Sequence, residues 1–185
     1  MSTIKPIETI YKGYRFRSRL EARWAVFFDN FGITYQYEME GFKLENGTGY
    51  LPDFWLPKVN LLLGAYTRDL YFEVKPKTDL EKTTVEKIVK FSGGVKDGII
   101  ICFGDPWIDT RVCYIAGNPN KTYFASDCKF AAWRDGETEI RGIAIEKIVQ
   151  ELLGSNDVYK QVTQEKEIIN AYQIARSTRF EYNGV

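Results

Sequence analysis

Three charged residues in the first half of the sequence have types and spacings suited to catalysis. Glu73 and Lys75 stand two residues apart within an apolar stretch, and Asp53 lies in the preceding apolar stretch. Because side chains alternate along a strand, Glu73 and Lys75 are expected on one face, with Phe72 and Val74 on the other. Charged groups on an apolar strand are costly to bury unless they pair or coordinate an ion. The pattern therefore predicts either a buried ion pair or a site for a cation.

The residue types favour a site for a hard cation. Carboxylates on two adjacent strands, Asp53 and Glu73, could supply the oxygen ligands that Mg²⁺ prefers. A lysine beside that ion, Lys75, could orient and deprotonate a water molecule. Hydrolysis of a phosphodiester needs a cation on the non-bridging oxygens, an activated water and stabilisation of the leaving oxygen. These residues therefore point to metal-dependent phosphodiester hydrolysis.

The composition removes several other kinds of active site. The sequence contains no histidine, which excludes Ser-His-Asp and Cys-His catalysis, histidine-ligated zinc and the histidine-based nucleases. It also lacks a phosphate-binding loop of the G-x-x-x-x-G-K-[ST] type. The 25 acidic residues balance the 25 basic residues, so DNA binding would have to use a local patch.

Such a patch is present near the start of the chain, where basic residues greatly outnumber acidic ones. Arg15, Arg17 and Arg19 are the candidate DNA contacts in this segment, which also contains Lys5 and Lys12. A solvated N-terminal arm is the alternative interpretation.

The cysteines and the apolar segments indicate a cytoplasmic protein without a membrane partner. Cys102, Cys113 and Cys128 are odd in number and widely spaced, which fits neither a disulfide framework nor a zinc site, so we expect reduced core residues. The sequence has no apolar N-terminal stretch of signal-peptide length and no run of about 18 apolar residues that could cross a bilayer.

The elements that must position these residues follow from hydrophobic periodicity. Apolar residues at spacings of three and four predict a helix from Ser18 to a stop at Gly32. Strict alternation predicts a half-buried strand over Ile33–Glu40, with Ile33, Tyr35, Tyr37 and Met39 on its apolar face. Further along the chain we expect a hairpin with arms Phe42–Leu44 and Tyr50–Leu56, and then a strand over Leu70–Lys75. A helix is expected over Asp79–Phe91, capped by Thr78 or Asp79 and followed by Gly93 and Gly94. A buried strand is expected over Ile99–Phe103.

The rest of the chain carries a weaker pattern. Strands are expected at Arg111–Ala116 and Lys129–Trp133, and helices near Ile143–Leu153 and Val158–Ala175. Lys58–Asp69 is an insertion long enough to put in question whether the strands on either side of it are neighbours. We expect one α/β (α+β) domain over residues 1–185, with a mixed sheet flanked by helices and accessory elements over residues 105–185.

Three ordered blocks of sequence resemble the PD-(D/E)XK nuclease superfamily. The blocks are Phe16-Arg17-Ser18-Arg19-Leu20-Glu21-Ala22-Arg23, Tyr50-Leu51-Pro52-Asp53-Phe54 and Phe72-Glu73-Val74-Lys75-Pro76, and they are similar to the Tn7 transposase TnsA-like endonucleases and to phage and bacterial relatives. The resemblance covers residues 14–104 and implies a core of one helix, three strands, a second helix and a fourth strand. It also implies that Glu21, Asp53, Glu73 and Lys75 form the active site.

The resemblance assigns a role to each of these residues. Asp53, Glu73 and the backbone carbonyl of Val74 are expected to hold Mg²⁺, for which Mn²⁺ could substitute, while Lys75 positions the water and Glu21 assists. Glu21 has a second interpretation, because Ser18-x-x-Glu21 is also a capping box at the start of a helix.

The resulting hypothesis is a metal-dependent endonuclease of phage or mobile-element type that hydrolyses DNA. The alternative is a module of the same fold with a spent site that binds DNA or a partner protein. Retention of the four polar site residues favours the enzyme, because unused buried charges reduce stability. A nuclease acting on RNA and a homodimer remain open at this point, since no residue pattern addresses either.

Overall fold

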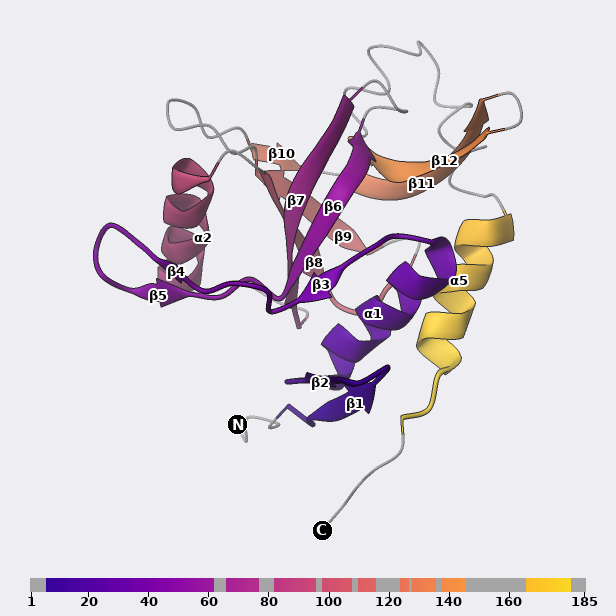
Figure 1. Ribbon diagram of the computed structural model, residues 1–185, viewed down its shortest axis with the longest axis horizontal. Helices are drawn as coiled ribbons and strands as arrows, with labels where there is room; N and C mark the ends of the chain where they lie inside the picture. The colour runs from indigo at the N-terminus through magenta and orange to yellow at the C-terminus, as the bar shows by residue number, and fades with distance from the viewer. Residues whose placement is uncertain are drawn as a thin grey trace.

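The computed structural model describes residues 6–61, 66–76, 82–95, 98–107, 110–115, 124–126, 128–135, 138–145 and 166–180. These residues form a mixed β-sheet with helices on both faces (Figure 1). The predicted combination of a mixed sheet with flanking helices is therefore confirmed. None of the described helices has the length and apolar composition needed to span a bilayer.

Strands outnumber helices in the described part of the chain. The helices are α1 (Arg19–Phe31), α2 (Lys82–Gly94) and α5 (Lys166–Ser177). The strands of the first half are β1 (Thr9–Tyr11), β2 (Tyr14–Phe16), β3 (Gln36–Tyr37), β4 (Phe42–Lys43), β5 (Gly49–Tyr50), β6 (Phe54–Leu61) and β7 (Tyr66–Lys75). Those that follow are β8 (Gly98–Phe103), β9 (Arg111–Ile115), β10 (Phe124–Ser126), β11 (Cys128–Asp135) and β12 (Thr138–Ile145).

The main sheet has β6, β7 and β8 at its centre. Its strand order is β10-β9-β8-β7-β6-β12-β11, and β3 also pairs with β6. Strands β6 and β7 are antiparallel with Phe54 opposite Phe72, whereas β7 and β8 are parallel. The strands on either side of the Lys58–Asp69 insertion are thus direct neighbours. The insertion extends this hairpin, and its residues 62–65 lie outside the described part of the chain.

Helix α1 has the two ends that the sequence predicts. Ser18 is its N-cap, and the Ser18 hydroxyl accepts a hydrogen bond from the Glu21 N–H. Gly32 is its C-cap with φ of 77°, a left-handed conformation that a residue without a side chain adopts at little cost.

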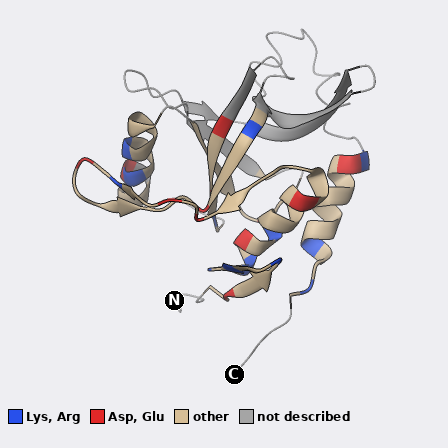
Figure 2. Cartoon of the chain, in the orientation of Figure 1, with Lys and Arg blue, Asp and Glu red and all other residues tan. Residues whose placement is uncertain are grey.

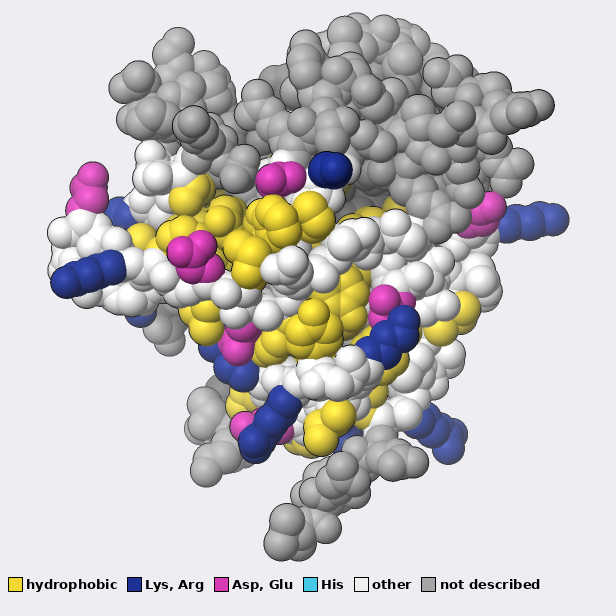
Figure 3. Space-filling view, viewed as in Figure 1, with side chains coloured by type: hydrophobic (Ala, Val, Ile, Leu, Met, Phe, Trp, Pro, Cys, Tyr) yellow, Lys and Arg dark blue, Asp and Glu magenta, His cyan; other side chains and the backbone are white. Residues whose placement is uncertain are grey.

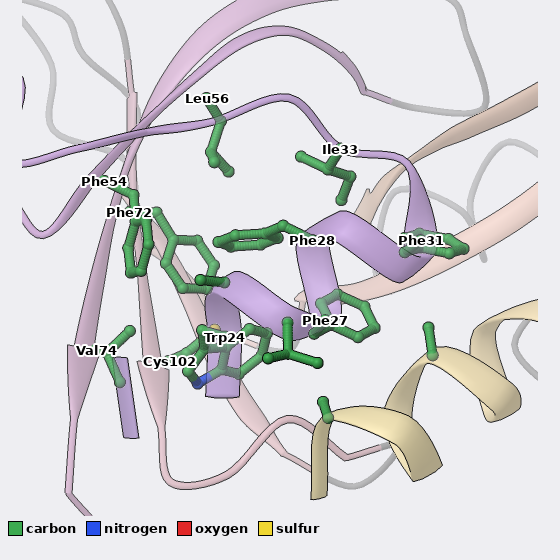
Figure 4. Close-up of a cluster of buried hydrophobic side chains, with 14 of the residues drawn as sticks. Trp24, Phe27, Phe28, Phe31, Ile33, Phe54, Leu56, Phe72, Val74 and Cys102 are labelled. Atoms are coloured by element: carbon green, nitrogen blue, oxygen red, sulfur yellow. The ribbon is translucent and has the colours of Figure 1, made fainter. Parts of the chain in front are cut away.

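Helices α1 and α5 pack on one face of the sheet. Trp24 and Phe28 of α1 each place their ring centroid 5.0 Å from that of Phe72 in β7 (Figure 4). Phe27 stacks on Tyr172 of α5 with centroids 4.7 Å apart. All of these side chains are buried, so burial of aromatic surface holds this layer together.

Helix α2 and the β4–β5 hairpin cover the opposite face. Phe91 of α2 lies 4.9 Å from Tyr71 of β7 and 4.8 Å from Tyr50 of β5, between ring centroids. Because Tyr71 and Phe72 belong to different cores, successive residues of β7 point to opposite faces. The predicted separation of Phe72 and Val74 from Glu73 and Lys75 is confirmed.

The predicted strand over Ile33–Glu40 is wrong in length. Only Gln36 and Tyr37 pair in the sheet, because Glu38 has φ of 44° and turns the backbone out of the extended conformation. The predicted inward face is confirmed for Ile33 and Tyr37, which are buried, but not for Met39, which is exposed.

The expected hairpin also divides differently. Strands β4 and β5 pair as predicted, but the second arm does not run through to Leu56. Strand pairing stops after Tyr50, and Phe54 begins β6 in the main sheet. Asp53 therefore precedes a strand instead of lying within one. Pro52, which cannot donate to a ladder, lies in the link between the strands.

Other predicted boundaries need correction. Helix α2 continues through Gly93 and Gly94, which do not follow it as expected, and the predicted caps Thr78 and Asp79 lie outside the described residues. The helix expected from Ile143 is wrong at its start, because Ile143 belongs to β12. Within the described ranges, β9 and β11 confirm the strands expected at Arg111–Ala116 and Lys129–Trp133. Helix α5 confirms the second half of the helix expected near Val158–Ala175. Cys102 is a buried core residue, as predicted, whereas nothing is described for the side chains of Cys113 and Cys128.

Candidate active site

Asp53 and Glu73 lie side by side because of the register of β6 and β7. The antiparallel pairing of Phe54 with Phe72 places the residue before β6 next to Glu73. The Asp53 N–H donates to Glu73 Oε2 over 3.3 Å, and the Val74 N–H donates to Asp53 Oδ2 over 2.7 Å. The Tyr50 hydroxyl also donates to Glu73 Oε2, over 3.0 Å. Internal donors thus fix one oxygen of each carboxylate.

Cationic side chains contact the other oxygen of each carboxylate. Lys75 Nζ lies against Glu73 Oε1, as expected for two residues on one face of a strand. Arg17 Nη2 lies 2.9 Å from Asp53 Oδ1. Both carboxylates are buried, so these contacts offset part of the cost of removing two negative charges from water.

Glu21 joins the same cluster from the first turn of α1. Its Oε1 accepts a hydrogen bond from the Ser18 hydroxyl over 2.7 Å. Its Oε2 accepts from the Tyr37 hydroxyl over 2.6 Å and from the Arg17 N–H over 3.1 Å. Glu21 therefore takes part in the helix cap and also lies at the site. The two interpretations of this residue are compatible, although its carboxylate returns to Arg17 N–H in place of the N-cap N–H of a standard capping box.

The four predicted site residues line one cleft with a volume of about 1210 Å³. Helix α1 supplies Glu21, the β5–β6 link supplies Asp53, and β7 supplies Glu73 and Lys75. The remaining wall is largely apolar, and it includes Ile7, Leu20, Phe42, Leu51 and Pro76. Hydrophobic side chains are also exposed across the middle of the face shown in Figure 3, with charged side chains around them.

Burial and neighbouring carboxylates shift the pKa of Asp53 and of Tyr50. Burial raises the pKa of Asp53 well above its ordinary value, and the neighbouring Glu73 and Glu21 carboxylates raise it further. The Val74 N–H and the Lys75 ammonium act in the opposite direction. Burial, together with the Glu73 charge and hydrogen bond, also raises the pKa of Tyr50, which keeps its hydroxyl protonated as a donor.

The donor set of the cleft can be compared with what Mg²⁺ requires. Within the described part of the chain, no group of three or more Asp, Glu or Cys side chains is arranged so that it could hold a metal ion. Both Glu21 oxygens are engaged by hydrogen-bond donors. Asp53 Oδ1 and Glu73 Oε1 face the cationic side chains of Arg17 and Lys75, and Mg²⁺ commonly binds through one or two carboxylates while retaining waters. The residues present therefore fit a Mg²⁺ site of two carboxylates, with the adjacent backbone at Val74 as the other predicted ligand.

The three predicted DNA contacts separate in the structure. Arg17 and Arg19 line the cleft, whereas Arg15 pairs with Glu8 on the surface and does not. Figure 2 shows Lys and Arg on the β1–β2 hairpin, on α1 and on α2. The segment expected to be a basic patch or a solvated arm is therefore a hairpin in which Lys12 also has an acidic partner, Asp29, at 3.2 Å.

Three residues of the site were not among the predicted ones. Tyr37 and Tyr50 each donate to a carboxylate of the cluster, and Glu38 contacts Arg17. Two signals were available, because Tyr37 lies on the apolar face of an alternating segment and Tyr50 belongs to the conspicuous Tyr50–Phe54 block. The role of Glu38 had no local signal, since alternation places it toward solvent.

Comparisons with known proteins identify no relative of this chain. Neither the protein-family models nor the curated proteins match its sequence, and no solved structure matches its fold. The geometry of the cleft is therefore the basis on which a function can be proposed.

Proposed function

We propose that this protein is a metal-dependent endonuclease that hydrolyses DNA phosphodiester bonds, of the kind found in phages and mobile elements. The observation that carries the proposal is the convergence of Glu21, Asp53 and Glu73, all buried, with Lys75 in one cleft. Three buried carboxylates are costly to keep together, and a bound divalent cation would offset that cost.

The chain's own residues would divide the reaction between them. Asp53 and Glu73 would hold the ion through Oδ1 and Oε1, because their other oxygens are fixed by internal donors. When bound, Mg²⁺ would supply charge neutralisation for the phosphate. Lys75, which lies against the same Glu73 oxygen, would turn its ammonium from that oxygen to orient the attacking water, and Tyr50 would keep Glu73 in place. The water oxygen bonds to phosphorus and releases a proton, the bond to one bridging oxygen breaks, and that leaving oxygen takes up a proton, which gives a hydroxyl and a phosphate monoester.

The order of elements supports a fold of the PD-(D/E)XK type. Helix α1 is followed by β6 and β7 carrying the acidic residues, then by α2 and by β8 parallel to β7. This order agrees with the helix, strands, helix and strand of that core. The spent-site alternative and action on RNA are outcomes that the following assay separates.

The proposal is tested by incubating the purified protein with plasmid DNA, linear duplex, single-stranded DNA and single-stranded RNA, each with Mg²⁺, Mn²⁺, Zn²⁺ or EDTA. Carboxylate ligands without histidine or thiolate predict cleavage of DNA with Mg²⁺ or Mn²⁺, and none with Zn²⁺ or EDTA. The control is Asp53→Asn, which removes a ligand charge with little change in shape and should not cleave. Cleavage in EDTA, or equal cleavage by Asp53→Asn, would contradict the metal site. Binding of DNA without cleavage under every condition would favour the spent-site module, and cleavage of RNA alone would change the substrate.

A further inference from the structure

Arg17 is in contact with two acidic side chains at the mouth of the cleft. Its Nη2 lies 2.9 Å from Asp53 Oδ1, and its Nε lies against Glu38 Oε1. The Arg17 side chain is 54% exposed, whereas that of Asp53 is 5% exposed. Because the Arg17 guanidinium is half-exposed, moving it away from Asp53 does not require it to lose more of its hydration. The buried Asp53 carboxylate, in contrast, needs another cation in its place.

The contact occupies the oxygen that the proposed metal site needs. Asp53 Oδ2 already accepts the Val74 N–H, so Oδ1 is the oxygen turned toward cations. A guanidinium and a divalent cation cannot both take the same lone pairs at close range without repelling each other. Arg17 and an ion bound by Asp53 therefore compete.

Glu38 is a second partner that Arg17 can keep after it leaves Asp53. Its Oε1 is buried and has no well-aligned hydrogen bond within the described residues, although it is within ion-pair distance of Arg17 Nε. The backbone of Glu38 has φ of 44°, and its N–H donates to the Asp53 carbonyl over 2.9 Å. This uncommon conformation for a residue with a side chain keeps the Glu38 carboxylate beside Arg17, where alternation would have turned it to solvent.

We propose that Arg17 is a displaceable counter-ion of the active site. It neutralises Asp53 when no divalent cation is bound, and when one binds it leaves Asp53 and keeps its contact with Glu38. Its released donors can then bind a phosphate oxygen of the substrate, for which the planar guanidinium is well suited. This inference rests on the proposed function, because it takes Asp53 as a metal ligand.

The test measures Mn²⁺ affinity without DNA, by electron paramagnetic resonance of the free ion. If Arg17 competes with the ion, Arg17→Gln should bind Mn²⁺ about fivefold more tightly than the parent, the factor that corresponds to one partly exposed ion pair. Arg19→Gln is the matched control, since Arg19 lines the same cleft and no ion pair with it is found among the described side chains. Its effect on Mn²⁺ affinity should be less than about twofold, because it changes only the field at a distance.

A double-mutant cycle tests the role of Glu38. Glu38→Gln removes the partner that Arg17 would keep after leaving Asp53, so Mn²⁺ should bind more weakly to this variant than to the parent. In the Arg17→Gln background the same substitution should have little effect, because Glu38 is argued to act through Arg17. An equal loss of affinity in both backgrounds would show a simple charge effect and would overturn the role of Glu38 in the proposal.

Two outcomes separate this inference from the proposed function. Asp53-dependent Mn²⁺ binding in the parent, with no tighter binding in Arg17→Gln, would overturn the counter-ion while leaving the metal site in place. Absence of Mn²⁺ binding in the parent would overturn both. Should Arg17→Gln fail to fold in a thermal melt, Arg17→Lys takes its place. Its single ammonium cannot span both carboxylates, so it should also bind Mn²⁺ more tightly than the parent, and equal or weaker binding would overturn the proposal.

Discussion

Strand β7 serves two regions of the molecule that differ in almost every physical respect. Phe72 and Val74 point into the aromatic core beneath α1, whereas Glu73 and Lys75 point into the cleft. The first region is held by burial of apolar surface, which is favourable without any partner of a particular charge. The second consists of charges whose burial is unfavourable unless each finds a counter-charge. One strand can therefore contribute stability from one face and chemistry from the other.

The aromatic core and the cleft also differ in how their side chains contact one another. Phe72 contacts Trp24 and Phe28, and loss of any one ring leaves the others packed together. Glu73 accepts from Tyr50, Asp53 and Lys75 through directed hydrogen bonds, whose geometry depends on the position of each donor. Changes on the core face should act on folding, and changes on the cleft face should act on reactivity.

The largest expected effect is on the core face. Phe72→Ala should lower the free energy of unfolding by about 3–5 kcal/mol, because it removes buried aromatic surface and leaves a cavity. Urea denaturation followed by tryptophan fluorescence measures this change. Glu73→Gln is the matched change on the other face. Its amide oxygen can still accept from Tyr50 and Asp53 and only the contact with Lys75 is lost, so the free energy of unfolding should fall by about 1–2 kcal/mol. Comparable losses in the two variants would remove the distinction between the faces.

A smaller effect is expected from Asp53, whose raised pKa reduces stability at neutral pH. A carboxyl whose pKa is higher in the folded state than in the unfolded state contributes stability below its unfolded pKa of about 4 and loses it as the pH rises through the folded value. Asp53→Asn cannot ionise, so without metal it should melt roughly 2–4 °C above the parent at pH 7 and close to the parent at pH 4.

The control for this pH dependence is Asp69→Asn, a change in the same sheet outside the cleft. The Asp69 carboxylate accepts the Lys58 N–H over 2.9 Å, so its removal should not stabilise the protein. A melting temperature of Asp53→Asn equal to or below that of the parent across this pH range would mean that ionised Asp53 is fully compensated by its neighbours.

The local sequence pattern was sufficient to predict α1 and β7, the elements that carry most of the site. The spacing of Leu20, Trp24 and Phe28 defines the inner side of α1, and the Ser18 and Gly32 caps define its ends. Alternation along β7 brings Glu73 and Lys75 together without information from elsewhere in the chain. These features depend on residues within a few positions of each other, which is why the sequence predicts them.

The errors arose where distant residues decide the structure. Ile143 lies in a short apolar run that suits a helix or a strand, and pairing with β6 and β11 selects the strand. Arg17 reaches Asp53 across 36 positions of sequence, so its pattern indicated only a basic patch. The turn at Glu38, where φ is positive, ends β3 although the alternation of apolar and polar residues continues beyond it. Hydrophobic periodicity does not reveal a positive φ, so the sequence predicted a longer strand.

Lys75→Ala tests whether the charged face of β7 performs catalysis, as we propose. Initial cleavage rate, salt-dependent DNA binding and a thermal melt are measured on the same preparations of Lys75→Ala, Lys75→Arg and the parent. We predict that Lys75→Ala folds and binds DNA, whereas its rate falls on the order of a hundredfold or more, because one preorganised charged group is lost. Lys75→Arg should not restore the rate, since a guanidinium stays protonated and places its donors differently. A Lys75→Ala variant that folds, binds and cleaves like the parent would contradict the assignment of catalysis to this cleft.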